Sequence, residues 1–140
     1  MGVKLFKYDE QQEQSYPVIG NISAGFPSPA DDFLGGKLDL NKYVIRNPPS
    51  TFFGIVDGLS MVDASFDEGD LIVIDKSLPA LDGKIAVCFL DGEFTVKRIK
   101  LEKECCYLMP ENKDFEPIKV DKDNDFLIWG IVTTVIKKVY

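Results

Sequence analysis

The chain has 140 residues, 45% of them hydrophobic and 28% charged, which are ordinary proportions for one globular domain with a hydrophobic core. Its formal net charge of −7 disfavours direct binding to nucleic acid, and it contains no histidine. The lack of an imidazole excludes every Ser-His-Asp and Cys-His mechanism.

Residues 1–24 are polar and glutamine-rich, and their weak hydrophobic periodicity predicts a flexible N-terminal arm with an extended patch at residues 16–19. The first seven residues lack the apolar core of a signal peptide. The chain also lacks an apolar run of the roughly 20 residues that a membrane-spanning helix needs. We therefore expect a cytoplasmic protein that does not bind a membrane.

Residues 25–50 predict a linker with one short helix. Pro27 and Pro29 forbid a regular helix at its start and favour extended backbone. Further along, Asp39 is a suitable N-cap, and the helix that follows it should end before Pro48.

Beyond residue 50 the sequence changes to short runs of β-branched and aromatic residues between turn residues, a pattern typical of strands. Two of these runs flank Asp91-Gly92, which is the strongest short-range signal for a β-hairpin. We predict a mainly β fold, with a single compact domain of antiparallel strands at residues 51–140. The expected strands are 51–56, 71–74, 84–90, 93–99, 105–109, 117–120 and 126–139, the last with a bend at Gly130.

Two other groups of residues could suggest a metal site, but neither predicts one. We also expect no cofactor. The three cysteines are odd in number and two are adjacent, so buried thiols are favoured over disulfides or structural zinc: Cys88, Cys105 and Cys106. Four acidic residues cluster without the spacing of an EF-hand loop, which favours a solvated turn over a cation site: Asp63, Asp67, Glu68 and Asp70.

Ser60 and Lys97 are the residues of greatest chemical interest. In a chain without histidine, a serine nucleophile needs another base, and a desolvated lysine is the main alternative. Lys97 shares a strand face with Thr95 and Ile99, so its stem can lie along an apolar surface. Both residues also have ordinary explanations, because serines near glycine commonly form turns and strand lysines commonly point to solvent.

Six short motifs follow one another along the chain: residues 24–32 (AGFPSPADD), 38–41 (LDLN), 58–61 (GLSM), 69–75 (GDLIVID), 91–98 (DGEFTVKR) and 108–112 (LMPEN). In this order they resemble the LexA/UmuD family of self-cleaving serine peptidases. The resemblance runs from about Tyr16 to Tyr140 and implies the β-rich fold of that family.

The resemblance implies a role for each matching residue. Ser60 is the nucleophile and Lys97 the general base, and the bond that they cut is the chain's own Ala24-Gly25 bond. We expect the backbone N–H groups of Leu59 and Ser60 to act as oxyanion donors, because the turn places them beside the nucleophile. Cleavage within one chain and between two chains are both sterically possible, since the linker is long when extended.

The same resemblance implies a biological setting. Cleavage would remove residues 1–24, and the truncated form would support translesion DNA synthesis in the SOS response. The implied partners are a second copy in a homodimer, a RecA filament on single-stranded DNA as activator, and a UmuC-like translesion polymerase.

Three other functions fit parts of the sequence. A non-catalytic interaction module could have the same fold, although Ser60 and Lys97 argue against it. The C-terminal type of domain of a LexA-like repressor would need a DNA-binding domain before it, and about two dozen residues precede Gly25. A signal-peptidase-like enzyme would use the same Ser-Lys chemistry but normally needs a membrane anchor.

Overall fold

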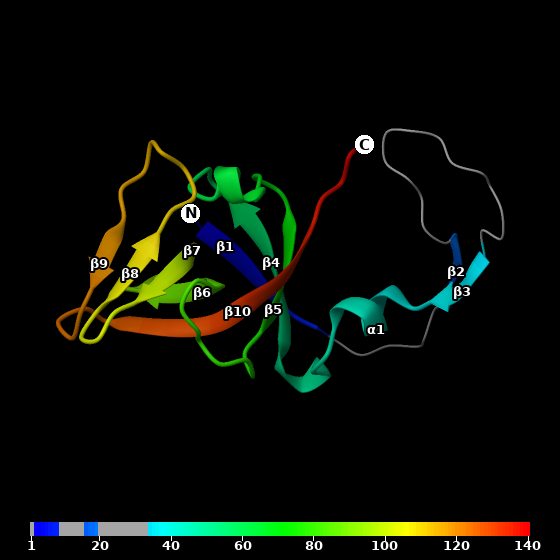
Figure 1. Cartoon of the computed structure of the whole chain (residues 1–140), viewed down its shortest axis with the longest axis horizontal. Coiled ribbons are helices and arrows are strands. Elements are labelled where there is room, and N and C mark those ends of the chain that lie inside the picture. The colour runs from blue at the N-terminus through cyan, green and yellow to red at the C-terminus, as the bar shows by residue number, and fades with distance from the viewer. Residues whose placement is uncertain (1, 9–15, 20–33) are drawn as a thin grey trace.

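The computed structural model describes residues 2–8, 16–19 and 34–140, and these residues form a mainly β fold (Figure 1). One large antiparallel sheet holds eight strands in the order β1-β4-β5-β10-β6-β7-β8-β9, and β2 and β3 pair separately. The strands are β1 (Gly2–Lys7), β2 (Tyr16–Ile19), β3 (Leu34–Leu38), β4 (Thr51–Asp57), β5 (Leu71–Asp75), β6 (Ile85–Leu90), β7 (Glu93–Leu101), β8 (Cys106–Met109), β9 (Ile118–Val120) and β10 (Phe126–Ile136).

The large sheet is curled, since its first strand, β1, also contacts β7, five places further along the sheet. Figure 1 shows β1 passing close to β7, with β8 and β9 on one side of the molecule and the small β2–β3 sheet on the other. The helical elements are short: α1 (Leu40–Val44), and the 3₁₀ turns η1 (Pro48–Ser50) and η2 (Val62–Ala64).

Two groups of buried apolar side chains hold the sheet together. The first lies among β4, β5, β6 and β7 and includes the fully buried Met61, which directly follows Ser60. The second is contributed mainly by β6, β7 and β8 and includes Ile99 and Leu108. Because β7 supplies residues to both groups, its backbone is fixed from two sides.

The mainly β prediction is confirmed, and the seven expected strands correspond to β4 through β10. At the expected hairpin, Asp91 and Gly92 have φ values of 47° and 93°, the left-handed conformation that a two-residue turn between twisted strands requires. The short helix also forms, because the Asp39 side chain accepts a hydrogen bond from the Asn41 N–H at 3.0 Å.

The structure differs from the prediction at both ends of the chain. Residues 2–7 of the expected flexible arm form β1, because β4 offers an edge to which they can pair. β10 ends at Ile136, whereas the sequence suggested residue 139. The register with β6 shifts between Ile128 and Gly130, as the expected bend implied, and a Cβ at Gly130 would lie 2.6 Å from Ile74 Cγ2.

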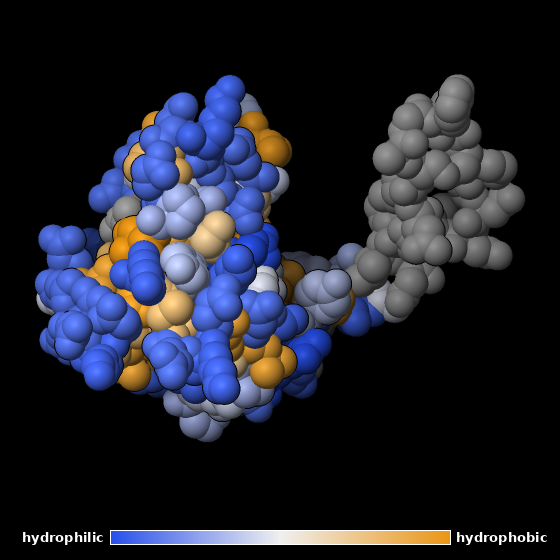
Figure 2. Space-filling model, turned by 60° about the vertical axis from the view of Figure 1, so that its left-hand side comes forward, coloured by the Kyte–Doolittle hydropathy of each residue, from blue (hydrophilic) through white to orange (hydrophobic). Residues whose placement is uncertain are grey.

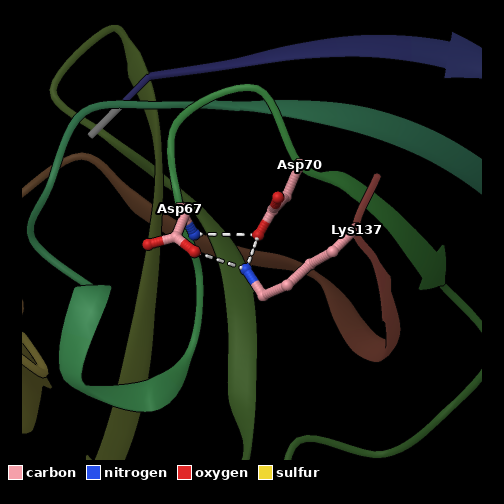
Figure 3. A network of polar contacts seen from close by, with 3 residues as sticks. All are labelled: Asp67, Asp70 and Lys137. Atoms are coloured by element: carbon pink, nitrogen blue, oxygen red, sulfur yellow. Dashed lines mark hydrogen bonds and ion pairs between the residues drawn. The ribbon is translucent and has the colours of Figure 1, made fainter. Parts of the chain in front are cut away.

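Two carboxylates of the acidic turn before β5 take part in an ion-pair network (Figure 3). Lys137 Nζ contacts Asp67 Oδ2 at 2.8 Å and also pairs with Asp70, which in turn accepts a hydrogen bond from the Asp67 N–H at 2.8 Å. These carboxylates raise the pKa of Lys137. The network fastens the residues after β10 to the loop that follows η2. Within the described ranges, no group of acidic or cysteine side chains is arranged to hold a metal ion.

None of the helices in the described part of the chain is both long and apolar enough to cross a bilayer.

Candidate active site

Ser60 lies in the turn that follows β4. The strand ends at Asp57, and Gly58 turns the chain with a φ of 101°, a conformation that residues with a side chain rarely adopt. After the turn, Ser60 and Met61 point into the protein and are 1% and 0% exposed. The serine is therefore buried beside the core. Leu59, which lies between Gly58 and Ser60 in the chain, remains 55% exposed.

Lys97 approaches Ser60 from β7, where it pairs with Ala86 of β6. Its side chain is buried, at 4% exposure, and its Nζ donates to Ser60 Oγ at 2.9 Å. The same Nζ donates to Thr95 Oγ1 at 2.8 Å and to the Val96 carbonyl at 3.2 Å. Three oxygen acceptors thus fix the position of the amine.

The surroundings of Lys97 disfavour its charged form. Burial lowers the pKa of Lys97, because the ammonium has lost most of its hydration. Burial also raises the pKa of the neighbouring Cys88 to about 12, so this thiol is neutral near pH 7 and provides no negative charge. No carboxylate within the described residues forms an ion pair with Lys97. A lysine in this environment can lose its proton and act as a base.

Two residues that were not predicted from the sequence support this arrangement. Thr95 binds the lysine, and its place two residues before Lys97 on the same strand face was a usable signal. Asn112 fixes the serine turn, since its Nδ2 donates to the Leu59 carbonyl at 2.8 Å. Asn112 belongs to one of the quoted motifs, but nothing local links it to a turn more than 50 residues earlier.

A groove leads to the lysine on the side of the molecule that carries β8 and β9. Figure 2 turns this side forward and shows apolar surface bordered by hydrophilic side chains. The groove lies next to the start of β1, the β6–β7 hairpin and the loop before β9. Its lining includes Val3, Phe94, Thr95, Lys97, Phe115 and Ile118.

The structure thus brings together Ser60 and Lys97. The remaining predicted site residues are not tested in this way. Ala24 and Gly25 lie outside the described residues, in the segment that connects β2 to β3. The oxyanion role of the Leu59 and Ser60 N–H groups stays a prediction.

Comparison with known proteins places this chain in a family. Residues 17–133 match the Peptidase S24-like family model. Protein MucA of Salmonella typhimurium and of Escherichia coli are each 48% identical over 116 residues, or 82% of this chain and 79% of theirs. Protein SamA of Salmonella typhimurium is 42% identical over 115 residues, with the same coverage. The LexA repressor of Acidithiobacillus ferrooxidans is 37% identical over 139 residues, 97% of this chain and 66% of its own. The chain therefore belongs to the Peptidase S24-like family, which confirms the resemblance that its motifs indicated.

Proposed function

We propose that this protein is a self-cleaving serine endopeptidase in which Ser60 is the nucleophile and Lys97 the general base. The observation that carries the proposal is the buried contact of 2.9 Å between Lys97 Nζ and Ser60 Oγ. It is the geometry that a nucleophile and its base need, and burial lowers the pKa of the lysine in the direction that a base needs. Membership of the family supports the same chemistry.

The reaction follows from this pair. Neutral Lys97 takes the proton from Ser60 Oγ while the oxygen attacks the carbonyl carbon of Ala24. The carbonyl oxygen becomes an oxyanion that N–H groups of the serine turn stabilise. The ammonium of Lys97 then returns its proton to the Gly25 nitrogen as the peptide bond breaks. Water then gives a proton to Lys97 and attacks the ester between Ser60 and Ala24, and Lys97 passes this proton to Ser60 Oγ as the ester bond breaks.

The proposed substrate is the chain's own Ala24-Gly25 bond, in the segment between β2 and β3. Small residues on both sides of this bond suit a confined active site, and Lys97 is among the residues that line a groove. Cleavage by the serine of the same chain and cleavage by the serine of another copy both fit this proposal.

In the cell, this cleavage would remove residues 1–24 and produce the form that supports translesion DNA synthesis during the SOS response. We propose that the protein acts in the cytoplasm as a homodimer, is activated by RecA filaments on single-stranded DNA, and then joins a UmuC-like polymerase. The similarity to MucA and SamA supports this setting.

The test is intact-mass analysis of the purified full chain after incubation at neutral pH and at about pH 10, near the reference pKa of lysine. Ser60→Ala and Lys97→Ala variants serve as controls. We expect two fragments, residues 1–24 and 25–140, to accumulate, and to do so faster at the higher pH. Neither variant should produce them. A parallel sample receives RecA, ATP and single-stranded DNA. A chain that stays intact in both conditions would favour the non-catalytic interaction module, and a fragment that persists in Ser60→Ala would indicate a contaminating protease.

A further inference from the structure

The first strand of the sheet lies upstream of the bond that we propose is cut. β1 is an edge strand, and β4 is its one neighbour in the sheet order of the described residues. The two strands pair antiparallel over the whole of β1, from Gly2 opposite Asp57 to Lys7 opposite Phe52. After cleavage at Ala24-Gly25, no covalent bond would join β1 to the rest of the domain.

The inward face of β1 is part of the core. Val3 and Leu5 pack against the first group of buried side chains, while Lys4 and Phe6 on the opposite face are exposed. Gly54 of β4 leaves room for this packing, because a Cβ there would lie 2.6 Å from Val3 Cγ1. A strand with apolar residues at alternate positions therefore fits the β4 edge closely.

The end of β1 is also fastened. Lys7 Nζ donates to the Pro49 carbonyl at 2.6 Å and lies 4.5 Å from the centre of the Phe52 ring. The Tyr8 N–H donates to the Thr51 carbonyl at 3.2 Å, and the Tyr8 ring meets that of Phe53 edge to face. These contacts join β1 to η1 and β4, both of which follow the proposed cleavage site in the chain.

From this geometry we infer that the β4 edge is an exchangeable strand-acceptor site whose occupant is the segment Gly2–Lys7. The severed N-terminal fragment stays bound to the cleaved domain through this segment, until the same segment of another copy replaces it. The severing step rests on the proposed function, but the binding site does not.

Occupancy of this edge bears on the active site, since Val3 lines the groove that also contains Lys97 and Thr95. When β1 leaves, the groove loses one wall and β4, which leads directly to Ser60, becomes an open edge. An open edge of this kind binds extended segments through main-chain hydrogen bonds. Exchange of β1 would thus link the state of the dyad to the presence of a second copy.

The experiment separates strand binding from self-cleavage. In the full chain carrying Ser60→Ala, a recognition sequence for a site-specific protease replaces residues 9–15. The protein is cut completely and passed over a gel-filtration column at about 10 µM, which is in the range of a micromolar dissociation constant for a peptide. It is then examined by native mass spectrometry. We expect the fragment that contains β1 to remain with the domain. Added isotopically labelled peptide of residues 1–8 should then replace it over time.

Two matched variants test the site itself. Leu5→Asp places a charge on the buried face of β1 and should weaken retention by about tenfold or more, whereas Phe6→Asp on the exposed face should retain the fragment. If Leu5→Asp does not fold before cutting, Leu5→Ala takes its place. The inference is overturned if the wild-type fragment separates on the column, if both variants behave alike, or if labelled peptide never exchanges.

Discussion

Lys97 and Thr95 lie two residues apart on the same face of β7, and the lysine Nζ donates a hydrogen bond to the threonine Oγ1 at 2.8 Å. The same nitrogen donates to Ser60 Oγ at 2.9 Å. The threonine and serine hydroxyls therefore bind the same amine, and the threonine restricts the direction in which the amine points. Thr95 has the geometry of a positioning residue for the proposed base.

Replacing Thr95 by valine removes this acceptor while keeping the shape of the side chain. We expect the maximal rate of self-cleavage to fall about tenfold, because Lys97 loses its fixed orientation. The midpoint of the pH–rate curve should also move to lower pH, since a hydroxyl acceptor favours the charged lysine and its loss lowers the pKa further. The measurement is the rate of appearance of the fragments from pH 6 to 11.

Thr95→Ser is the control, because it keeps the hydroxyl and should retain most of the activity. A Thr95→Val enzyme with the wild-type midpoint, and only a lower rate, would indicate that the threonine supports the strand and does not act on the lysine.

The sequence was most informative where structure depends on neighbours in the chain. Asp91 and Gly92 both adopt positive φ values, and this local requirement identified the hairpin that carries Lys97. Likewise, the N-cap at Asp39 depends on its contact two residues away. Such features were predictable because their free energy comes from residues close in sequence.

Contacts distant in sequence were not accessible in this way. β1 was expected to be flexible, because its alternation of Val3, Lys4 and Leu5 is short and its partner β4 begins more than 40 residues later. The contact of Asn112 with Leu59 has no local signal either. The pairing of Ser60 with Lys97 was suggested by family motifs, and composition contributed the exclusion of histidine as the base.

Asn112 provides a second test of the site. Its Nδ2 donates to the Leu59 carbonyl, and its Oδ1 accepts from the Asp114 N–H at 3.0 Å. Asn112→Asp keeps the acceptor but loses the donor, so the turn that holds Ser60 should become less well fixed. We expect self-cleavage about tenfold slower, with a change in unfolding free energy below about 1 kcal/mol, because the side chain is near the surface.

Asn112→Ala, which removes both bonds, is the comparison for this variant. Equal slowing in the two variants would assign the effect to the bond with Leu59. The interpretation fails if Asn112→Ala is slow and Asn112→Asp is as fast as the wild type.

Burial of Lys97 should also cost stability. The folded-state pKa is lowered, so the unfolded chain binds more protons than the folded one between the folded pKa and about 10.4. Stability from this group therefore increases as the pH rises through that window. Lys97→Met should raise the unfolding free energy at pH 7 by about 1–3 kcal/mol, and this gain should disappear above about pH 10.4.

Urea unfolding of wild type and Lys97→Met at several pH values measures this difference. Lys100→Met, an exposed substitution on the same strand, controls for the removal of a charge. A Lys97→Met protein that is less stable than the wild type at pH 7 would contradict the argument.

Asp75 should have a pH dependence of the same sign, but in the acidic range. Burial raises its pKa, but hydrogen bonds from Ser77, Asn47 and Ser50 outweigh burial and hold the pKa below its usual value. Asn47 Nδ2 lies 2.7 Å and Ser50 Oγ 3.0 Å from the carboxylate, so the buried end of β5 is tied to the residues just before β4.

Because the folded pKa of Asp75 is lowered, its contribution to stability is complete above the unfolded pKa of about 3.9 and is lost as the pH falls through the folded pKa. Asp75→Asn should thus reduce the unfolding free energy at pH 7 by about 1.5–3 kcal/mol, the usual range for hydrogen bonds to a charged group. The deficit should shrink below about pH 4. Chemical unfolding at pH 7 and pH 3 measures it, with the exposed Asp123→Asn as control. A deficit of the same size at both pH values would mean that the shape of the side chain, and not its charge, holds β5 to the preceding turn.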